Sequence, residues 1–528
     1  MFSGKIQWDW IAEPAPSLQK RTWRQHLGVL IPLSLIYFAL AFYRIDHQSL
    51  WVDEVISAIK ADPNAPFRGW FGGRGPLYPV MLRLWAKWGS SEFALRSFSA
   101  VVGGLTVCLA YLTGLQLCNR RVAQIGTALV ATSPFLIWYS QEVRYISLMI
   151  AAALLATYMF SLALSARNLW WWPLYCGSLL LAIAAFVVNI ILPVAHGLYL
   201  VCAPSRRQVL RQWVACQLLV FALFSWWAND GHLRHLSGYW LALSVKITPR
   251  DGDAAHVQPL IRLDTGSSRS FTWMALPYTV FAFSTGFSLG PSVRELQVSR
   301  ALTALWPHAF IVSITSLLFA GLFILGVVDL WRRPDAGRLL IFWLAVPLLA
   351  TLGVSALLPS LAYNVRYVAM SWPAYMFILA AGLASLRRPT LQISALAAVV
   401  VFHGLSLANY YFDAHYSRED ARAAARYLET ATRPGEIIVV VGNDLGLRYY
   451  YRGDVPVASV SRPLINKRTG LSEHLEKLNE EHERLWLVEI RSWEADPQGT
   501  VKAILDERYR LREQKGLAGV DIYAYQRR

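Results

Sequence analysis

The chain has 528 residues, of which 55% are hydrophobic and only 16% are charged, and its mean hydropathy is +0.35. That is more apolar surface than one soluble core can bury, so the composition excludes an ordinary soluble domain and predicts a membrane protein. The formal net charge of +16 does not indicate nucleic-acid binding, because the basic residues form short clusters between apolar runs. We therefore expect membrane lipids, and no nucleic acid, among its partners.

The cysteines and the first apolar run exclude two further classes. The five cysteines lie in or beside apolar runs and form no Cys-x-x-Cys pair: Cys108, Cys118, Cys176, Cys202 and Cys216. This pattern predicts neither a disulfide framework nor a zinc knuckle. The first apolar run begins near Leu27 after a polar lead and continues to Arg44, which predicts a retained first helix and not a cleaved signal peptide.

About eleven segments are apolar over the roughly 20 residues that span a bilayer. They are 27–43, 96–118, 122–138, 145–165, 169–188, 190–203, 213–229, 309–330, 339–358, 367–386 and 390–408. Together they predict an α-helical polytopic transmembrane domain over residues 27–408.

The distribution of Lys and Arg predicts the orientation of these spans. Basic residues precede the first span and then occupy every second loop: Lys20, Arg21, Arg24, Arg120, Arg121, Arg167, Arg206, Arg207, Arg211, Arg332, Arg333, Arg338, Arg387 and Arg388. Because basic loops stay in the cytoplasm, residues 1–26 are expected inside, and the loops 44–95 and 230–308 outside. We expect a cell inner-membrane protein whose chain after about residue 409 is periplasmic.

Residues 409–528 have a different pattern, which predicts a small extracytoplasmic α/β domain. An acid precedes the amphipathic run 421–430, as at a capped helix, and residues 436–442 form an apolar run that ends in glycine, as in a buried strand. A second strand is predicted over 485–490 and a further helix over 501–508.

Two adjacent acids, Asp53 and Glu54, lie in the first outer loop shortly after the first span. A carboxylate at the edge of a membrane is partly desolvated, which suits a proton acceptor. A solvated loop acid is the simpler interpretation, and the motifs in the rest of the loop argue against it.

These motifs occur in a defined order. The first outer loop contains Gly72-Gly73-Arg74-Gly75-Pro76-Leu77-Tyr78-Pro79, Leu82-Arg83-Leu84-Trp85 and Ala94-Leu95-Arg96-Ser97, and Tyr139-Ser140-Gln141-Glu142-Val143-Arg144-Tyr145 follows the third span. The ordered set resembles the GT-C class of membrane glycosyltransferases. It is most similar to the bacterial, family 39-like branch related to protein O-mannosyltransferases and to the aminoarabinose transferase that modifies lipid A. The resemblance covers about residues 27–410 and is strongest over 49–147.

The resemblance implies transfer of a sugar, with inversion, from a polyprenyl-phosphate carrier on the outer face of the membrane. It implies that Asp53 is the general base on the acceptor, with Glu54 beside it, and that Glu142 occupies the position of a second acid. One base is enough for direct displacement, because a phosphate leaving group needs little or no protonation. Glu142 could equally form an ion pair with Arg144.

The anionic head of such a donor requires cations near the outer surface, for which the planar fork of arginine is well suited. The candidates are Arg74, Arg144 and Arg366, the last within Tyr363-Asn364-Val365-Arg366-Tyr367. Any one of them could instead be an interfacial anchor. Three aromatic residues of the same motifs are expected to shape the substrate site: Tyr78, Tyr145 and Tyr367.

The sequence leaves metal dependence open but argues against a nucleotide-linked donor. His232 and His235 have a spacing that a metal ion could use, with His256 nearby, but no ordered third ligand accompanies them. Some members of the class use a divalent ion, so metal dependence is left open. No Gly-Lys-Ser/Thr phosphate loop is present, and the inside loops are too short for a nucleotide-binding domain, so we expect a lipid-linked donor.

Two other classes of function remain as alternatives. A lipid or saccharide transporter or flippase would place ionisable residues near the membrane midplane, whereas the acids and arginines here lie at the outer ends of spans. A non-catalytic scaffold would tolerate loss of Asp53. The sequence does not identify the sugar, the oligomeric state, or whether the acceptor is a lipid, a glycan or a protein.

Overall fold

The structure, a computed structural model, describes residues 23–63, 75–165, 168–227, 274–298, 302–357, 363–460, 464–465 and 468–527. The chain forms two compact units. We call the first the membrane unit; it contains the described residues of Met1–Tyr43, Pro66–Leu84 and Ser97–Leu407. The second, the loop–tail unit, contains those of Arg44–Ala65, Trp85–Arg96 and Ala408–Arg528.

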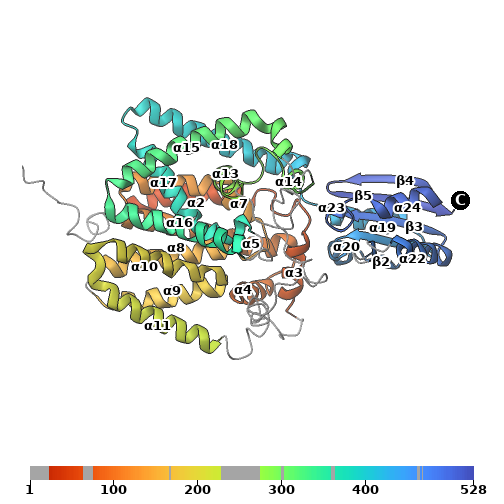
Figure 1. Ribbon diagram of the computed structural model, residues 1–528, viewed down its shortest axis with the longest axis horizontal. Coiled ribbons are helices and arrows are strands. Elements are labelled where there is room, and N and C mark those ends of the chain that lie inside the picture. The colour runs from red at the N-terminus through yellow and green to blue at the C-terminus, as the bar shows by residue number, and fades with distance from the viewer. Residues whose placement is uncertain are drawn as a thin grey trace, which may run out of the picture. The chain divides into compact units, whose positions relative to one another are not determined.

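The membrane unit is built from helices, several of which continue into the loop–tail unit. They are α2 (Trp23–Phe42), α4 (Leu77–Ala86), α5 (Glu92–Leu117), α6 (Arg120–Thr132), α7 (Pro134–Ser140), α8 (Ile146–Ser165), α9 (Trp171–Ala185), η1 (Val187–Ile191), α10 (Leu192–Cys202), η2 (Pro204–Val209), α11 (Leu210–Trp227), α13 (Ala275–Thr285), α14 (Val293–Val298), η5 (Leu302–His308), α15 (Ala309–Trp331), α16 (Pro334–Leu357), η6 (Val365–Ser371), α17 (Trp372–Ser385) and α18 (Pro389–Phe412). Helix α15 packs along α17, α8 along α9, and α10 along α16 (Figure 1).

Each of the eleven predicted spans contains a helix. Within the described residues, eight helices are long and apolar enough to cross a membrane, and the bent pair of α6 and α7 adds a ninth. The 50° bend between α6 and α7 lies at Pro134, whose ring cannot continue a helix and which has no N–H to donate. The two remaining predicted spans are shorter apolar helices, Trp171–Ala185 and Val187–Cys202. The chain is therefore a multi-pass membrane protein, as its composition predicts.

Glycine allows α15 and α17 to pack closely against each other. Gly326 of α15 faces α17 so closely that a Cβ would overlap the carbonyl of Ile378, and a Cβ on Gly382 would overlap that of Leu322. Lipid offers no hydrophobic force between helices, so such close backbone contact is a main source of association.

The loop–tail unit contains a five-stranded sheet in the order β2-β1-β3-β5-β4. Strands β1 (Ile437–Gly442), β2 (Val457–Val460) and β3 (Arg484–Ile490) are parallel, and β4 (Tyr509–Leu517) and β5 (Val520–Arg527) are an antiparallel hairpin. The unit also contains α3 (Val52–Ala61), α19 (Ala421–Ala431), α20 (Asp444–Tyr450), α22 (Arg468–Glu481), α23 (Ser492–Ala495) and α24 (Thr500–Arg508), with the turn η7 (Ala414–Tyr416) before the sheet (Figure 1).

Both faces of the sheet are buried at its central strands β1 and β3. Ile438 and Val440 of β1 pack with Leu428 of α19, whereas the alternating residues Val439 and Val441 pack on the opposite face, where α22 and α24 lie. The continuous apolar runs of β1 and β3 follow from this double burial, since a parallel strand is covered on both sides.

The predicted helices 421–430 and 501–508 and the strands 436–442 and 485–490 are confirmed as α19, α24, β1 and β3. Strands β2, β4 and β5 were not predicted. The predicted α/β fold class of the tail is nevertheless confirmed.

Glu489 on β3 should make the stability of the sheet depend on pH. It is half-buried directly opposite Asp521 of β5, and burial together with the charge of Asp521 raises the pKa of its carboxyl to about 7. An unfolded Glu titrates at about 4.3, so the folded state binds more protons between that value and about 7, and stability falls as pH rises through this range.

Glu489→Gln removes the carboxylate whose ionisation destabilises the sheet. We expect the amides of β3 and β5 in the variant to exchange more slowly than in wild type at pH 8, after correction for intrinsic rates, and the difference to shrink at pH 5. An equal difference at both pH values would show that Glu489 is not the titrating group.

Candidate active site

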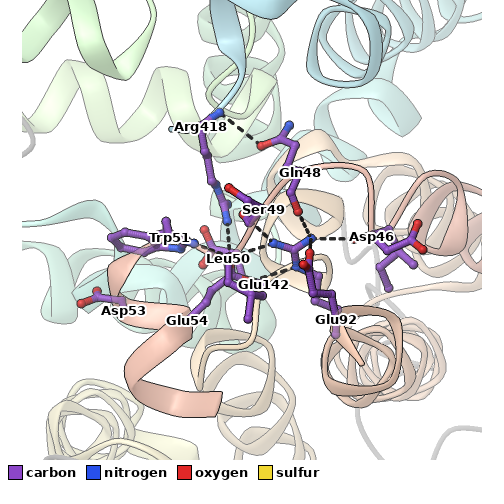
Figure 2. A network of polar contacts seen from close by, with 12 residues as sticks. Asp46, Gln48, Ser49, Leu50, Trp51, Asp53, Glu54, Glu92, Glu142 and Arg418 are labelled. Carbon is purple, nitrogen blue, oxygen red and sulfur yellow. Dashed lines mark hydrogen bonds and ion pairs between the residues drawn. The ribbon is translucent and has the colours of Figure 1, made fainter. Parts of the chain in front are cut away.

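The acid pair lies in the first turn of α3, which begins after Trp51. Glu54, the third helical residue, accepts a hydrogen bond from the backbone N–H of Trp51 through Oε2 at 3.3 Å, which caps the helix. Asp53 is half-buried, whereas Glu54 is fully buried. Figure 2 shows that the Glu54 side chain points into a polar cluster and the Asp53 side chain points away from it. The two neighbouring acids therefore have different environments.

Glu54 forms a buried, two-point ion pair with Arg96. Arg96 Nε donates to Oε1 at 3.0 Å and Nη2 donates to Oε2 at 2.9 Å, and Arg96 is only 1% exposed. Its remaining N–H groups donate to backbone carbonyls of the loop: Ile45 (2.9 Å), Gln48 (2.7 Å) and Ser49 (3.2 Å). All five guanidinium N–H groups thus have an acceptor, and the loop folds around one side chain.

Arg418, which precedes α19, adds a second cation to Glu54. Its Nη1 donates to Glu54 Oε2 at 3.2 Å, its backbone N–H donates to Gln48 Oε1 at 3.3 Å, and its guanidinium lies 5.8 Å from the centre of the Trp51 ring (Figure 2). Next to it, Ser49 Oγ donates to the carbonyl of Glu419 at 2.7 Å. The start of α3 is therefore attached to the chain before α19 by several polar contacts.

Glu92 is the second anion of this cluster. Its Oε1 accepts from Arg422 Nη1 at 3.0 Å and from the Tyr450 hydroxyl at 2.9 Å, and the same Tyr450 oxygen accepts from the N–H of Leu50 at 2.7 Å. Arg422 also donates to the carbonyls of Asp46 and His47. Residues from α19 and α20 thus satisfy backbone groups of the loop that have no strand or helix partner.

Asp53 lies within electrostatic range of Arg491, which follows β3. Burial lowers the pKa of this guanidinium, but the carboxylates of Glu419, Glu494 and Asp53 outweigh it and raise the pKa. Arg491 Nη1 donates to Glu419 Oε1 at 3.0 Å, and Nε donates to Glu494 Oε1 at 2.9 Å. Arg491, a cation bound by two other acids, therefore lies near Asp53.

The acid pair does not fit a metal ion shared by both carboxylates. Both oxygens of Glu54 already accept from arginine, and Asp53 points the other way (Figure 2). The histidines His232, His235 and His256 lie outside the described residues, as does Arg74.

The other described candidates belong to the membrane unit and gather around a stack of three rings. Tyr145 stacks on Phe186 with ring centres 4.3 Å apart, and Phe186 stacks on Tyr367 at 5.9 Å. Arg144 lies 5.1 Å from the centre of the Tyr145 ring, and Arg366 lies 5.4 Å from that of Tyr367. The structure therefore brings two predicted phosphate ligands and two predicted substrate-shaping residues together, although 221 positions (366 − 145) separate Tyr145 from Arg366.

Two more candidates, Tyr78 and Glu142, lie in the same membrane unit. The Tyr78 hydroxyl is 3.2 Å from Ser99 Oγ, which donates to the carbonyl of Arg144 at 3.5 Å. Glu142 is buried and accepts a hydrogen bond from Trp138 Nε1 at 2.9 Å.

The sequence did not identify the residues that hold the acid pair. Arg96 was visible in the motif Ala94-Leu95-Arg96-Ser97, but its partner could not be inferred from that motif. Arg418 and Tyr450 are 364 and 358 residues away from their respective partners Glu54 and Glu92, and no local pattern connects them.

Arg96→Met should destabilise the loop–tail unit strongly. Removing one partner of a buried ion pair leaves the other charge uncompensated, at a cost of about 3–5 kcal/mol. The matched control is Arg508→Met, whose exposed pair with Glu476 is worth at most about 1 kcal/mol. Thermal unfolding of the full chain in lipid nanodiscs measures both variants. Equal shifts would contradict a special role for Arg96.

The comparisons with known proteins agree with this architecture. The family model described as dolichyl-phosphate-mannose-protein mannosyltransferase matches residues 73–228. No curated protein matches the chain. Among solved structures, ArnT from Cupriavidus metallidurans bound to undecaprenyl phosphate is 13% identical, with a TM-score of 0.56 over 94% of this chain and 98% of that one.

Archaeal oligosaccharyltransferases have the same fold. AglB from Archaeoglobus fulgidus, in complex with an inhibitory peptide and a dolichol-phosphate, is 13% identical with a TM-score of 0.51, over 95% of this chain and 74% of that one. The oligosaccharyltransferase of the same organism tethered with an acceptor peptide is 12% identical with a TM-score of 0.54, over 97% and 75%. The protein therefore has the fold of the GT-C membrane glycosyltransferases, and the resemblance of its motifs to that class is confirmed.

Proposed function

We propose that the protein is an inverting glycosyltransferase that moves a sugar from a polyprenyl-phosphate-linked donor to an acceptor on the outer face of the inner membrane. The observation that carries the proposal is that the two adjacent acids, Glu54 and Asp53, have different environments. Glu54 is neutralised by Arg96 and Arg418, while Asp53 on the next position points away from them (Figure 2). Of the two acids, Asp53 is therefore the one that we assign as general base.

In the proposed step, an acceptor hydroxyl oxygen attacks the anomeric carbon of the donor sugar. The new carbon–oxygen bond forms as the bond from that carbon to the phosphate oxygen breaks, and the phosphate leaves with the electron pair. The acceptor proton passes to Asp53. Since attack and departure occur on opposite sides of the carbon, the anomeric configuration inverts, and the phosphate needs no acid.

Arg144 and Arg366 are the proposed ligands of the donor phosphate. Each has a guanidinium packed on a tyrosine ring of one continuous stack, which restricts the cation before the anion arrives and lowers the entropy lost on binding. Similarity to proteins whose structures contain undecaprenyl phosphate or dolichol-phosphate supports a lipid-linked donor. Arg74 is a third proposed ligand on sequence grounds.

The Lys and Arg distribution supports the orientation that this reaction requires. With residues 1–26 in the cytoplasm, the acid pair and the sheet would both lie on the outer side. A donor with its sugar exposed on that face would then meet an envelope lipid, glycan or protein as acceptor.

Asp53→Asn should abolish most transfer while keeping the size of the side chain. Loss of a general base is expected to lower the rate of transfer from radiolabelled polyprenyl-phosphate sugars by at least about 10²-fold. The matched control is Asp62→Asn, the same change just after the end of α3. Transfer by Asp53→Asn at the wild-type rate would exclude Asp53 as base. Failure of wild type to consume any donor in a broad panel would favour transport or scaffolding.

Arg366→Gln should weaken donor binding more than it slows the chemical step. Removing a charge-assisted contact with phosphate is expected to raise KM for the donor by about tenfold or more. Arg388→Gln, in the loop after α17, is the control. An unchanged KM would show that Arg366 is an anchor. The same assay with chelator, followed by added Mg²⁺ or Mn²⁺, tests the divalent-ion alternative.

A further inference from the structure

Glu54 is held by arginines from two distant parts of the chain, and only one of them belongs to the recognised motifs. Arg96 lies in the first turns of α5, whereas Arg418 belongs to the tail that carries the sheet. We propose that Arg418 is a positioning residue for sugar transfer: it fixes the first turn of α3 through Glu54 and so fixes Asp53. The inference rests on the proposed function for the role of Asp53.

Glu54 accepts hydrogen bonds from two cations and from the backbone. The carboxylate is fully buried, and Oε2 accepts from Arg96 Nη2, Arg418 Nη1 and the backbone N–H of Trp51. A buried charge is stable only when its lone pairs are satisfied, so each donor limits the positions that the carboxylate can occupy.

Arg418 contacts the helix start at three separate points. Its guanidinium binds Glu54 and lies against the Trp51 ring, while its backbone N–H donates to the Gln48 side chain. These three partners come immediately before α3 and within its first turn. Arg418 therefore restrains the direction in which the helix begins, and not only the charge of Glu54.

Asp53 must follow any movement of this turn. It lies between Trp51 and Glu54, both of which Arg418 contacts, and its side chain points away from them (Figure 2). Displacing a reacting group by about 1 Å can reduce a rate by about 10²-fold. The tail domain is thus inferred to support the catalytic group itself.

The experiment compares Arg418→Met and Arg418→Lys in the full-length protein in lipid nanodiscs, with Arg508→Met as control. Arg508 lies in the same tail but pairs with Glu476 at the surface. The first measurement is amide exchange, which needs no substrate. We expect residues 50–56 to exchange at least about tenfold faster in Arg418→Met, while the amides of β1 and β3 keep their protection.

The second measurement is transfer. A loss of positioning should lower kcat by about tenfold or more, with donor KM within about twofold of wild type, and Arg418→Lys should recover part of kcat because it keeps the charge. If Arg418 acts through Glu54, Arg418→Met should have little further effect in a Glu54→Gln background.

Unchanged exchange over residues 50–56, or unchanged kcat, in Arg418→Met would overturn the inference. So would a full additional loss in the Glu54→Gln background. If wild type transfers no sugar, the proposed function fails, and the exchange measurement still decides whether Arg418 holds the start of α3.

Discussion

The buried ion pair between Glu54 and Arg96 is the interaction on which the loop before α3, and with it the candidate site, depends. Residues 45–51 form no strand and no α-helix, so their carbonyls need partners from elsewhere. Arg96 supplies three of these partners while it neutralises Glu54. One side chain therefore both folds the loop and makes a buried carboxylate tolerable.

The same ion pair separates the roles of two adjacent acids. The resemblance seen in the sequence implies that Asp53 is the base, with Glu54 as its neighbour, but it gives no physical reason for that choice. In the structure, Glu54 accepts from two arginines and is fully buried, whereas Asp53 is half-buried and points away (Figure 2). A carboxylate with both oxygens held by guanidinium groups is a poor proton acceptor, because protonation would break those contacts.

The sequence predicts the elements whose environment is apolar along their whole length: helices surrounded by lipid and strands buried on both faces. Lipid requires about 20 apolar residues per span, so the helices of the membrane unit are visible from hydropathy. Burial on both faces makes β1 and β3 visible as apolar runs. Strand β4, in contrast, is exposed along most of its length and reads Tyr-Arg-Leu-Arg-Glu-Gln-Lys-Gly-Leu, so it has no apolar run or periodicity to detect. Strand β2 has only four residues.

In the candidate site, too, some features could be predicted from the sequence and others could not. Asp53, Arg144 and Tyr145 could be proposed because they lie in ordered motifs, but the contacts of Arg418 with Glu54 and of Phe186 with Tyr367 join segments that share no local pattern. In the proposed reaction, one carboxylate acting as base is enough. A hydrolase needs two carboxylates because its leaving group must be protonated, whereas a phosphate leaves as an anion and requires cations. The second acid of the pair is then available for structure, and Glu54 serves that purpose by holding the turn that carries Asp53.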